Sequence, residues 1–470
     1  MITVAAPLQH IAALWSKPDH REGETFRLMR YVLRLDHDGR VLLHNVVTGQ
    51  LAALDKAEAE ILDRLPLRYE PAMDQLIDAH YLVAERFDEH HRFVKMREVL
   101  RKMMAPSSSE WITNYTILPT TACNARCYYC YERGVPVHTM TEKTADDTVK
   151  FITDRCGPGK KVSIRWFGGE PTVAADRIDR ICEGLAANGI DFKSSMTTNG
   201  YLLDEEMVSR AKTRWNLKDV MISVDGTERN YNEIKAYVNA ADNPYQRVMR
   251  NIGLLLDSEI HVELRMNFDL GNWQDFEPLM KEAIKRWPKN PFLQVHVFPV
   301  EGEYPNRNGK VLHGSDEWFD GKIAELNDMA RDAGVFRREL ELPSLFFANC
   351  YAGESSFMVI TPEGKLGRCT GVFEREDQIV GDVTDGVTVM DPYSSWQRFA
   401  EPKRCVDCAF LPKCVLIDRC HGKDRCFYKE TRRQNEEAIK SMYDRWKKSD
   451  GLKGGGYHDH AGAESRVCSD

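Results

Sequence analysis

The middle of the chain alternates between short apolar runs and amphipathic stretches. The apolar runs lie at residues 114–119, 162–167, 192–198, 219–224, 262–267 and 293–298. Segments of helical periodicity separate them, such as 207–215 and 276–287. Repeated strand–helix units predict a parallel sheet with right-handed crossovers. Six such units predict an α/β fold, a partial (β/α)6 barrel of the TIM type over residues 110–310.

The pattern before this region predicts a separate small module over residues 20–105. Residues 30–35 and 40–46 alternate as strands do, and Asp38-Gly39 between them is a hairpin signal. A third short strand is expected at Leu51–Leu54. Two short amphipathic helices and one charged helix follow, at 57–65, 71–82 and 88–103. This order predicts a winged-helix module, and Pro106–Ser109 reads as the linker to the barrel.

The last part of the chain has a different character. Residues 345–430 are rich in cysteine and show little regular pattern, which predicts a cysteine-rich domain. A charged helix is expected over 431–450. The Gly-rich polar tail over 451–470 is expected to be disordered.

Composition narrows the possible functions. The net charge of −8 and the pI near 6.0 argue against binding of nucleic acid through phosphate contacts. No run approaches the roughly 20 apolar residues of a membrane helix, and the N-terminus lacks the basic region of a signal peptide. We therefore expect no nucleic acid or membrane partner and a cytoplasmic location. In that reducing compartment the 13 cysteines are expected to bind metal or do chemistry rather than form disulfides.

The polar, thiol and glycine-rich motifs all follow the predicted strands. Cys123-Asn-Ala-Arg-Cys127-Tyr-Tyr-Cys130 follows the first strand, and Gly168-Gly169-Glu170 follows the second. Active sites of TIM-type barrels lie at the C-terminal ends of the strands, so these motifs are expected on one rim. Three thiolates in one loop can bind a [4Fe–4S] cluster and leave one iron open, since such a cluster takes four ligands. The alternative is a zinc site with His138 as the fourth ligand.

The other rim residues suit a zwitterionic ligand. Gly168 and Gly169 allow close backbone approach, and Glu170 can accept a hydrogen bond from an ammonium group. Further contacts are expected from residues that follow the later strands or the thiol loop. Ser223 and Arg265 can donate to a carboxylate, Asn199 can bind a ribose, and Tyr129 offers a ring face for a base.

Together these residues resemble the radical S-adenosylmethionine (SAM) superfamily. Its C-x3-C-x2-C signature matches Cys123, Cys127 and Cys130, with Tyr129 as the aromatic residue before the last cysteine. Its Gly-Gly-Glu motif matches Gly168, Gly169 and Glu170. The resemblance covers residues 112–300. It implies a [4Fe–4S] cluster whose open iron binds SAM, and a 5′-deoxyadenosyl radical that takes a hydrogen atom from the substrate.

The C-terminal cysteines resemble the SPASM extension of that superfamily. By this resemblance one auxiliary [4Fe–4S] cluster is held by Cys405, Cys408, Cys414 and Cys426, and the other by Cys350, Cys369 and Cys420. The spacing departs from the usual pattern, because five residues rather than three separate Cys414 from Cys420. Three clusters in all are then expected, one of them with an iron open to a substrate thiolate. Paired zinc ribbons are the alternative.

The N-terminal module resembles the recognition element with which peptide-modifying enzymes hold the leader of a precursor peptide. In that family the leader adds as a strand to a sheet edge. The strand Leu51–Leu54 is the expected edge. A structural cap on the barrel is the alternative.

These features predict a maturase of a ribosomally made peptide that forms a crosslink, with a cysteine thioether as the first choice. Its partners would be the precursor peptide and an external electron donor such as flavodoxin or ferredoxin. A carbon–carbon crosslink and formylglycine formation on a sulfatase are the rival reactions. A zinc-stabilised winged-helix regulator is the rival without enzymatic activity.

Overall fold

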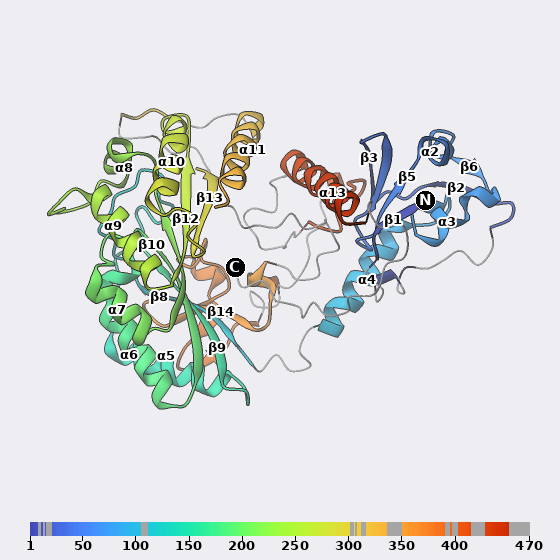
Figure 1. Cartoon of the computed structure of the whole chain (residues 1–470). Coiled ribbons are helices and arrows are strands. Elements are labelled where there is room, and N and C mark those ends of the chain that lie inside the picture. The colour runs from blue at the N-terminus through green and yellow to red at the C-terminus, as the bar shows by residue number, and fades with distance from the viewer. Residues whose placement is uncertain are drawn as a thin grey trace.

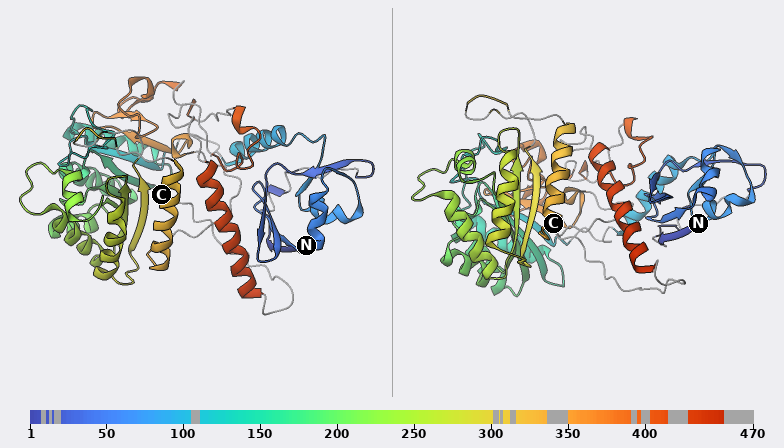
Figure 2. Two further views of the ribbon diagram at one scale, coloured as in Figure 1. Left: turned by 90° about the horizontal axis from the view of Figure 1, so that it is seen from above. Right: turned by 45° about the horizontal axis from the view of Figure 1, so that its top comes forward.

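The computed structural model describes most of the chain. It covers residues 1–7, 11–12, 15, 21–104, 111–300, 305, 308–311, 316–335, 350–390, 395–396, 403–414 and 428–450. The barrel and the N-terminal module lie at opposite ends of the molecule, and the C-terminal helix α13 (Tyr428–Asp450) lies between them (Figures 1 and 2). Among the described residues, no helix is long and apolar enough to cross a membrane.

Six consecutive parallel strands form the predicted partial barrel. They pair in the order of the chain: β8 (Asn114–Thr120), β9 (Lys161–Gly168), β10 (Asp191–Thr198), β11 (Leu217–Ser223), β12 (His261–Phe268) and β13 (Leu293–Pro299). The helices of this part of the chain are α5 (Glu142–Arg155), α6 (Ala175–Ala187), α7 (Glu205–Thr213), α8 (Glu228–Lys235), α9 (Pro244–Asp257), α10 (Phe276–Arg286) and α11 (Asp316–Asp332). The expected α/β fold is confirmed.

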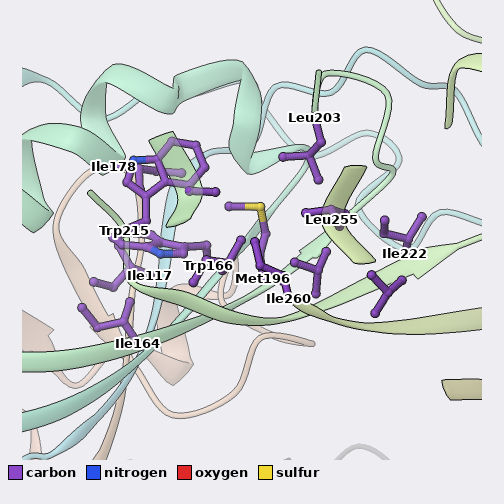
Figure 3. Close-up of a cluster of buried hydrophobic side chains, with 14 of the residues drawn as sticks. Ile117, Ile164, Trp166, Ile178, Met196, Leu203, Trp215, Ile222, Leu255 and Ile260 are labelled. Carbon is purple, nitrogen blue, oxygen red and sulfur yellow. The ribbon is translucent and has the colours of Figure 1, made fainter. Parts of the chain in front are cut away.

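Alternation of side chains along each strand explains the layers. On β9, Val162, Ile164 and Trp166 are buried, whereas Ser163 and Arg165 between them are only partly buried. The buried set packs against the helices, where it meets residues from the other strands and helices in one continuous core (Figure 3). The other face of the sheet carries these polar side chains and points to the interior of the barrel.

The cysteine-rich region contains more regular structure than its sequence pattern predicts. Strand β14 (Phe357–Ile360) pairs parallel with β8 and so continues the barrel sheet. The sheet then runs on through β15 (Lys365–Gly367), β16 (Gly381–Asp382) and β17 (Gly386–Val387). These strands are two to four residues long, too short for their periodicity to stand out in the sequence.

The predicted elements of the N-terminal module are present, except that the helix expected over 71–82 is an α-helix only at Asp74–Asp78 and Leu82 lies in a strand. Strands β3 (Val32–His37) and β4 (Arg40–Asn45) form a hairpin, and β5 (Leu51–Leu54) pairs with β4. Asp38 and Gly39 at the turn have φ values of 51° and 72°, the left-handed conformation that a tight hairpin turn requires. The helices are α2 (Lys56–Asp63), α3 (Asp74–Asp78) and α4 (Glu89–Met104).

Four further strands of this module were not predicted. Strands β2 (Thr25–Leu28), β6 (Leu67–Arg68) and β7 (Leu82–Ala84) form a second small sheet. Strand β1 (Ile2–Ala5) pairs antiparallel with β5. The edge at Leu51–Leu54, the expected site for a peptide, is paired with β1 in this structure.

Two C-terminal segments pack directly on the N-terminal module. Leu411 is fully buried in the main core of the module. The Arg30 guanidinium donates to the carbonyl oxygen of Val406 at 3.0 Å and lies 3.4 Å from the carboxylate of Asp407. Helix α13 covers the second face of the module's sheet with Ile439 and other apolar side chains. The module and the cysteine-rich region thus share a core.

We predict that Leu411→Ala destabilises the N-terminal module, although residue 411 lies far from it in sequence. Removing a buried leucine side chain costs about 2–5 kcal/mol. Hydrogen exchange of the backbone amides of β4 and α4 measures the change as faster exchange. Val389→Ala is the matched control, because Val389 is 45% exposed. Unchanged exchange in Leu411→Ala would show that residue 411 does not support this core.

Candidate active site

The three cysteines of the signature lie on the loop that follows β8. Their thiols are close enough to affect one another electrostatically, and each is partly buried. Burial is the main cause that raises the pKa of Cys123 to about 12 and the pKa of Cys127 to about 11. The loop is fixed from one side by Arg126, whose backbone N–H donates to the carbonyl oxygen of Lys235 at 2.7 Å.

The two glycines after β9 allow its end to touch this loop. A Cβ atom on Gly168 would lie 2.3 Å from the carbonyl oxygen of Thr120, and one on Gly169 would lie 2.4 Å from that of Thr121. Gly168 also has a φ of 122°, which other residues rarely adopt. Only glycine fits at either position, so both glycines are needed to hold the backbone against the thiol loop.

Glu170 is fully buried and ties three segments together. Its Oε1 accepts hydrogen bonds from the backbone N–H and hydroxyl of Thr172, at 3.1 and 2.5 Å, and from the Thr198 hydroxyl at 2.7 Å. Its Oε2 accepts from the backbone N–H of Asn199 at 2.7 Å. Burial raises the pKa of Glu170 despite these donors. The carboxylate joins the end of β9 to the end of β10 and keeps acceptor capacity on Oε2 for a ligand ammonium group.

Asn199 connects the end of β10 to the thiol loop. Its Nδ2 donates to Oδ1 of Asn124 at 2.7 Å, and its Oδ1 accepts from the backbone N–H of Tyr201 at 3.0 Å. Asn124 lies next to Cys123 in the chain. The residue expected to bind a ribose therefore sits beside the expected cluster loop.

A buried network of charged and polar side chains lies at the ends of β11 and α8. The Nζ of Lys235 lies 2.8 Å from Oδ2 of Asp225 and donates to the Ser223 hydroxyl at 2.7 Å. The Tyr129 hydroxyl donates to the same carboxylate at 2.8 Å, and Nδ2 of Asn267 donates to its Oδ1 at 3.0 Å. Burial disfavours the charged amine, yet the Asp225 carboxylate raises the pKa of Lys235 well above its ordinary value. The Lys235 amine is therefore charged at neutral pH.

Sequence reasoning did not find Lys235. The residue ends helix α8, and its side chain is 2% exposed, whereas lysine in an amphipathic helix is usually at the surface. Nothing in the local pattern distinguishes it from its exposed neighbours. Its position is set by the strand end that carries Ser223 and Asp225, a contact that only the tertiary structure creates.

Arg265 lies opposite Ser223 across the β11–β12 ladder. Its guanidinium stacks on the ring of Phe298, with the carbon 4.0 Å from the ring centroid. Nearby, Nδ1 of His296 and a carboxylate oxygen of Glu263 lie 3.2 Å apart. Polar groups of both charge signs therefore line this part of the barrel wall.

The auxiliary cysteines fall into two places. Cys350 and Cys369 lie close to Tyr351, whose ring faces Arg165 of β9 at 5.9 Å. Arg368, fully buried beside Cys369, donates to the carbonyl oxygens of Ala352, Glu354 and Phe357.

The second place is the segment 403–414, which carries Cys405, Cys408 and Cys414. Cys405 and Cys408 pack against the core of the N-terminal module. The described cysteines thus separate as the two expected clusters would require, although the full ligand sets remain predictions. Cys420 and Cys426 lie outside the described residues.

The donor chemistry of the signature loop fits an iron–sulfur cluster. The three cysteines lie on one loop, the charge of Glu170 acts on Cys123 and that of Lys235 on Cys127, and thiolate is the usual ligand of such clusters. Over the part of the chain that the structure describes, no three His, Cys, Asp or Glu side chains are near enough to one another to hold a single metal ion.

Comparison with known proteins agrees with this site. Residues 117–283 match the family model of the radical SAM superfamily. The GTP 3′,8-cyclase of Clostridium perfringens (strain SM101 / Type A) is 25% identical over 269 residues, which cover 53% of this chain and 78% of that protein. The GTP 3′,8-cyclase of Chlorobaculum tepidum is 34% identical over 113 residues, 24% of this chain and 33% of that protein.

Two groups of solved structures have a similar fold. The structure of anSMEcpe with bound AdoMet and the Cp18Cys peptide has a TM-score of 0.55 and 16% identity over 72% of this chain and 99% of that one. Streptococcus suis SuiB bound to the precursor peptide SuiA has a TM-score of 0.50 and 15% identity over 83% of this chain and 94% of that one. Residues 117–283 therefore form a radical SAM domain.

Proposed function

We propose that this protein is a radical SAM maturase that crosslinks a ribosomally made peptide, with a cysteine thioether as the product. The observation that carries the proposal is the direct packing of the N-terminal module on the cysteine segment 403–414. A module suited to an extended peptide then stands beside the expected auxiliary cluster. A peptide held by the module would lie beside that cluster.

The extent of the structural likeness supports a peptide rather than a nucleotide as the substrate. The likeness in structure to SuiB, solved with its precursor peptide, covers 83% of this chain and extends beyond the radical SAM domain at 117–283. The likeness in sequence to the GTP 3′,8-cyclase of Clostridium perfringens covers 53% of the chain.

The residues of the site have distinct proposed roles. Cys123, Cys127 and Cys130 hold a [4Fe–4S] cluster, and the cluster with SAM supplies a 5′-deoxyadenosyl radical for hydrogen abstraction when both are bound. The other contacts to SAM come from the surrounding strand ends. They are Gly168, Gly169 and Glu170 for the amino group, Asn199 for the ribose, Tyr129 for the base, and Ser223 and Arg265 for the carboxylate.

Lys235 adds a fixed positive charge to this set. Its ammonium lies on the Ser223 hydroxyl and beside Tyr129, two residues proposed to bind SAM. Because Asp225 holds the lysine in place, the charge needs little reorganisation when an anionic carboxylate arrives. We propose that Lys235 positions Ser223 and favours the SAM carboxylate.

The barrel interior has the polarity to hold a peptide segment. Arg265 and Phe298 form a stacked pair, and Nδ1 of His296 lies 3.2 Å from a carboxylate oxygen of Glu263 on the neighbouring strand. Such groups can orient backbone amides and side chains of a substrate and exclude water from the reacting carbon. We propose that the modified residue lies along this wall.

The auxiliary cysteines and the electron donor complete the proposal. Two auxiliary [4Fe–4S] clusters would accept the electron left after bond formation, and one would bind the substrate thiolate. An external donor such as flavodoxin or ferredoxin would supply electrons. We propose a cytoplasmic location, a reducing compartment in which cysteines stay available as ligands.

We predict that the signature cysteines bind one of three clusters. After anaerobic reconstitution the protein should hold about twelve iron atoms, and Cys123/Cys127/Cys130→Ala should lose about four of them, since each cluster has four irons. The variant should also fail to cleave SAM. Iron and sulfide analysis measures this. Cys156→Ala/Cys182→Ala is the control, because both residues lie in the barrel core. Zinc in place of iron would contradict the assignment.

We predict that Lys235→Met weakens SAM binding by about ten-fold or more, because it leaves the Asp225 carboxylate buried without its cation. Breaking a buried ion pair costs about 3–5 kcal/mol, part of which appears as lower stability. Equilibrium dialysis of SAM with the reconstituted enzyme gives the affinity. Lys218→Met removes an exposed lysine and should change nothing. Equal affinity in both variants would exclude a role for Lys235.

The bond made can be identified from the thiols of the product. The protein is co-expressed with a library of short cysteine-containing peptides, and peptides that lose two hydrogen atoms are isolated by mass spectrometry. A thioether should leave its cysteine resistant to iodoacetamide. A product with an alkylatable cysteine would indicate a carbon–carbon bond, and conversion of cysteine to an aldehyde would indicate formylglycine.

A further inference from the structure

The strand pair β1–β5 is the starting observation. Strand β1 lies antiparallel to β5, with Ile2 opposite Ala53 and Thr3 opposite Ala52. The register then shifts, so that Ala5 rather than Val4 lies opposite Leu51. A four-residue strand with a shift inside it makes few regular backbone pairs. Strand β1 therefore forms only a short and irregular pairing with β5.

Side-chain contacts of β1 are also few. Val4 is 3% exposed and packs with Leu42, Leu51 and Ala53 of the sheet and with Ile439 of α13. Ile2, by contrast, is 36% exposed. Val4 is thus the fully buried side chain of the strand, Ala5 packs against the same cluster, and Met1 just before the strand packs against the main core and pairs its ammonium with Glu58.

The main core of the module does not include this strand. Helices α2, α3 and α4 pack on the other face of the sheet, through residues such as Leu43, Ala52 and Leu54. No residue of Ile2–Ala5 belongs to that core. The module therefore has its own core, which does not need β1.

Without β1, the outer strands of the sheet would be β3 and β5, and the two differ in their chemistry. Strand β3 carries Arg34, Asp36 and His37, and charged side chains of this kind protect a sheet edge against pairing. Strand β5 is Leu-Ala-Ala-Leu, so it carries no charged side chain, and its backbone N–H and C=O groups need a partner strand. A peptide strand is therefore expected at β5 rather than at β3.

We propose that β1 is an exchangeable occupant of the β5 edge, which an extended peptide with an aliphatic residue at the position of Val4 replaces. The identity of that peptide rests on the proposed function, whereas the exchange itself does not. The backbone pairing of β5 would supply affinity, and the pocket now filled by Val4 would supply selectivity. A peptide that enters must compete with a tethered strand, whose effective concentration is on the order of millimolar.

The test uses the full chain and a labelled synthetic peptide, MITVAAP, which has the sequence of residues 1–7. Val4→Asp places a charge in the apolar pocket and should expel β1. Fluorescence anisotropy should then show that Val4→Asp binds the labelled peptide about ten-fold or more tightly than the wild type does. Thr3→Asp introduces the same charge at an exposed position of the same strand and should bind like the wild type. The peptide MITDAAP should bind none of them.

Equal binding of MITVAAP to Val4→Asp and to the wild type would overturn the proposal. Hydrogen exchange of the wild type provides a second measurement that needs no variant. The amides of β1 should exchange on the order of 100-fold faster than those of β4, because exchangeable segments open locally. Equally slow exchange in both strands would make β1 a permanent fourth strand and would also overturn the proposal.

These measurements involve neither SAM nor a cluster nor a precursor peptide. If β1 exchanges but no crosslinked peptide is found, the proposed function is wrong and the inference about β1 still holds. If a crosslinked peptide is found but β1 does not exchange, the proposed function holds and the inference about β1 is wrong.

Discussion

The contact between the end of β9 and the thiol loop is the constraint on which the site depends. Gly168 and Gly169 bring two backbones closer than any side chain would allow. Glu170 then follows at once and reaches the end of β10 through Thr198 and Asn199. Three strand ends are thus fixed by one short segment. The loop that carries the cysteines takes its position from this contact rather than from its own sequence.

Buried charged groups are the second organising element, and the two described next are paired with other groups of the protein. Lys235 and Asp225 neutralise each other, while Arg368 donates to three backbone carbonyls beside Cys369. Unpaired groups at such depth would be strongly destabilising. The paired groups restrict the side chains to one arrangement, which orders the surroundings of the signature loop.

The six barrel strands and the hairpin at Asp38-Gly39 could be predicted because their signals are local: alternation, length and turn chemistry. The cysteine signature was equally visible as spacing. Lys235 could not be found, because its burial depends on a strand more than ten residues away. Strand β1 was missed because four residues carry little periodicity and their partner lies far along the chain. The features that were not predicted are those that depend on contacts between residues far apart in the sequence.

The shared core around Leu411 bears on how this architecture can be divided. A cut at the linker near residue 106 would separate the N-terminal module from a side chain that fills it and from the helix that covers its sheet. A chimera that transplants only the first hundred residues would therefore carry an exposed cavity and a bare sheet face. Recombination between related enzymes is expected to preserve both ends of the chain together. The smallest transferable unit is discontinuous in sequence, although it is continuous in space.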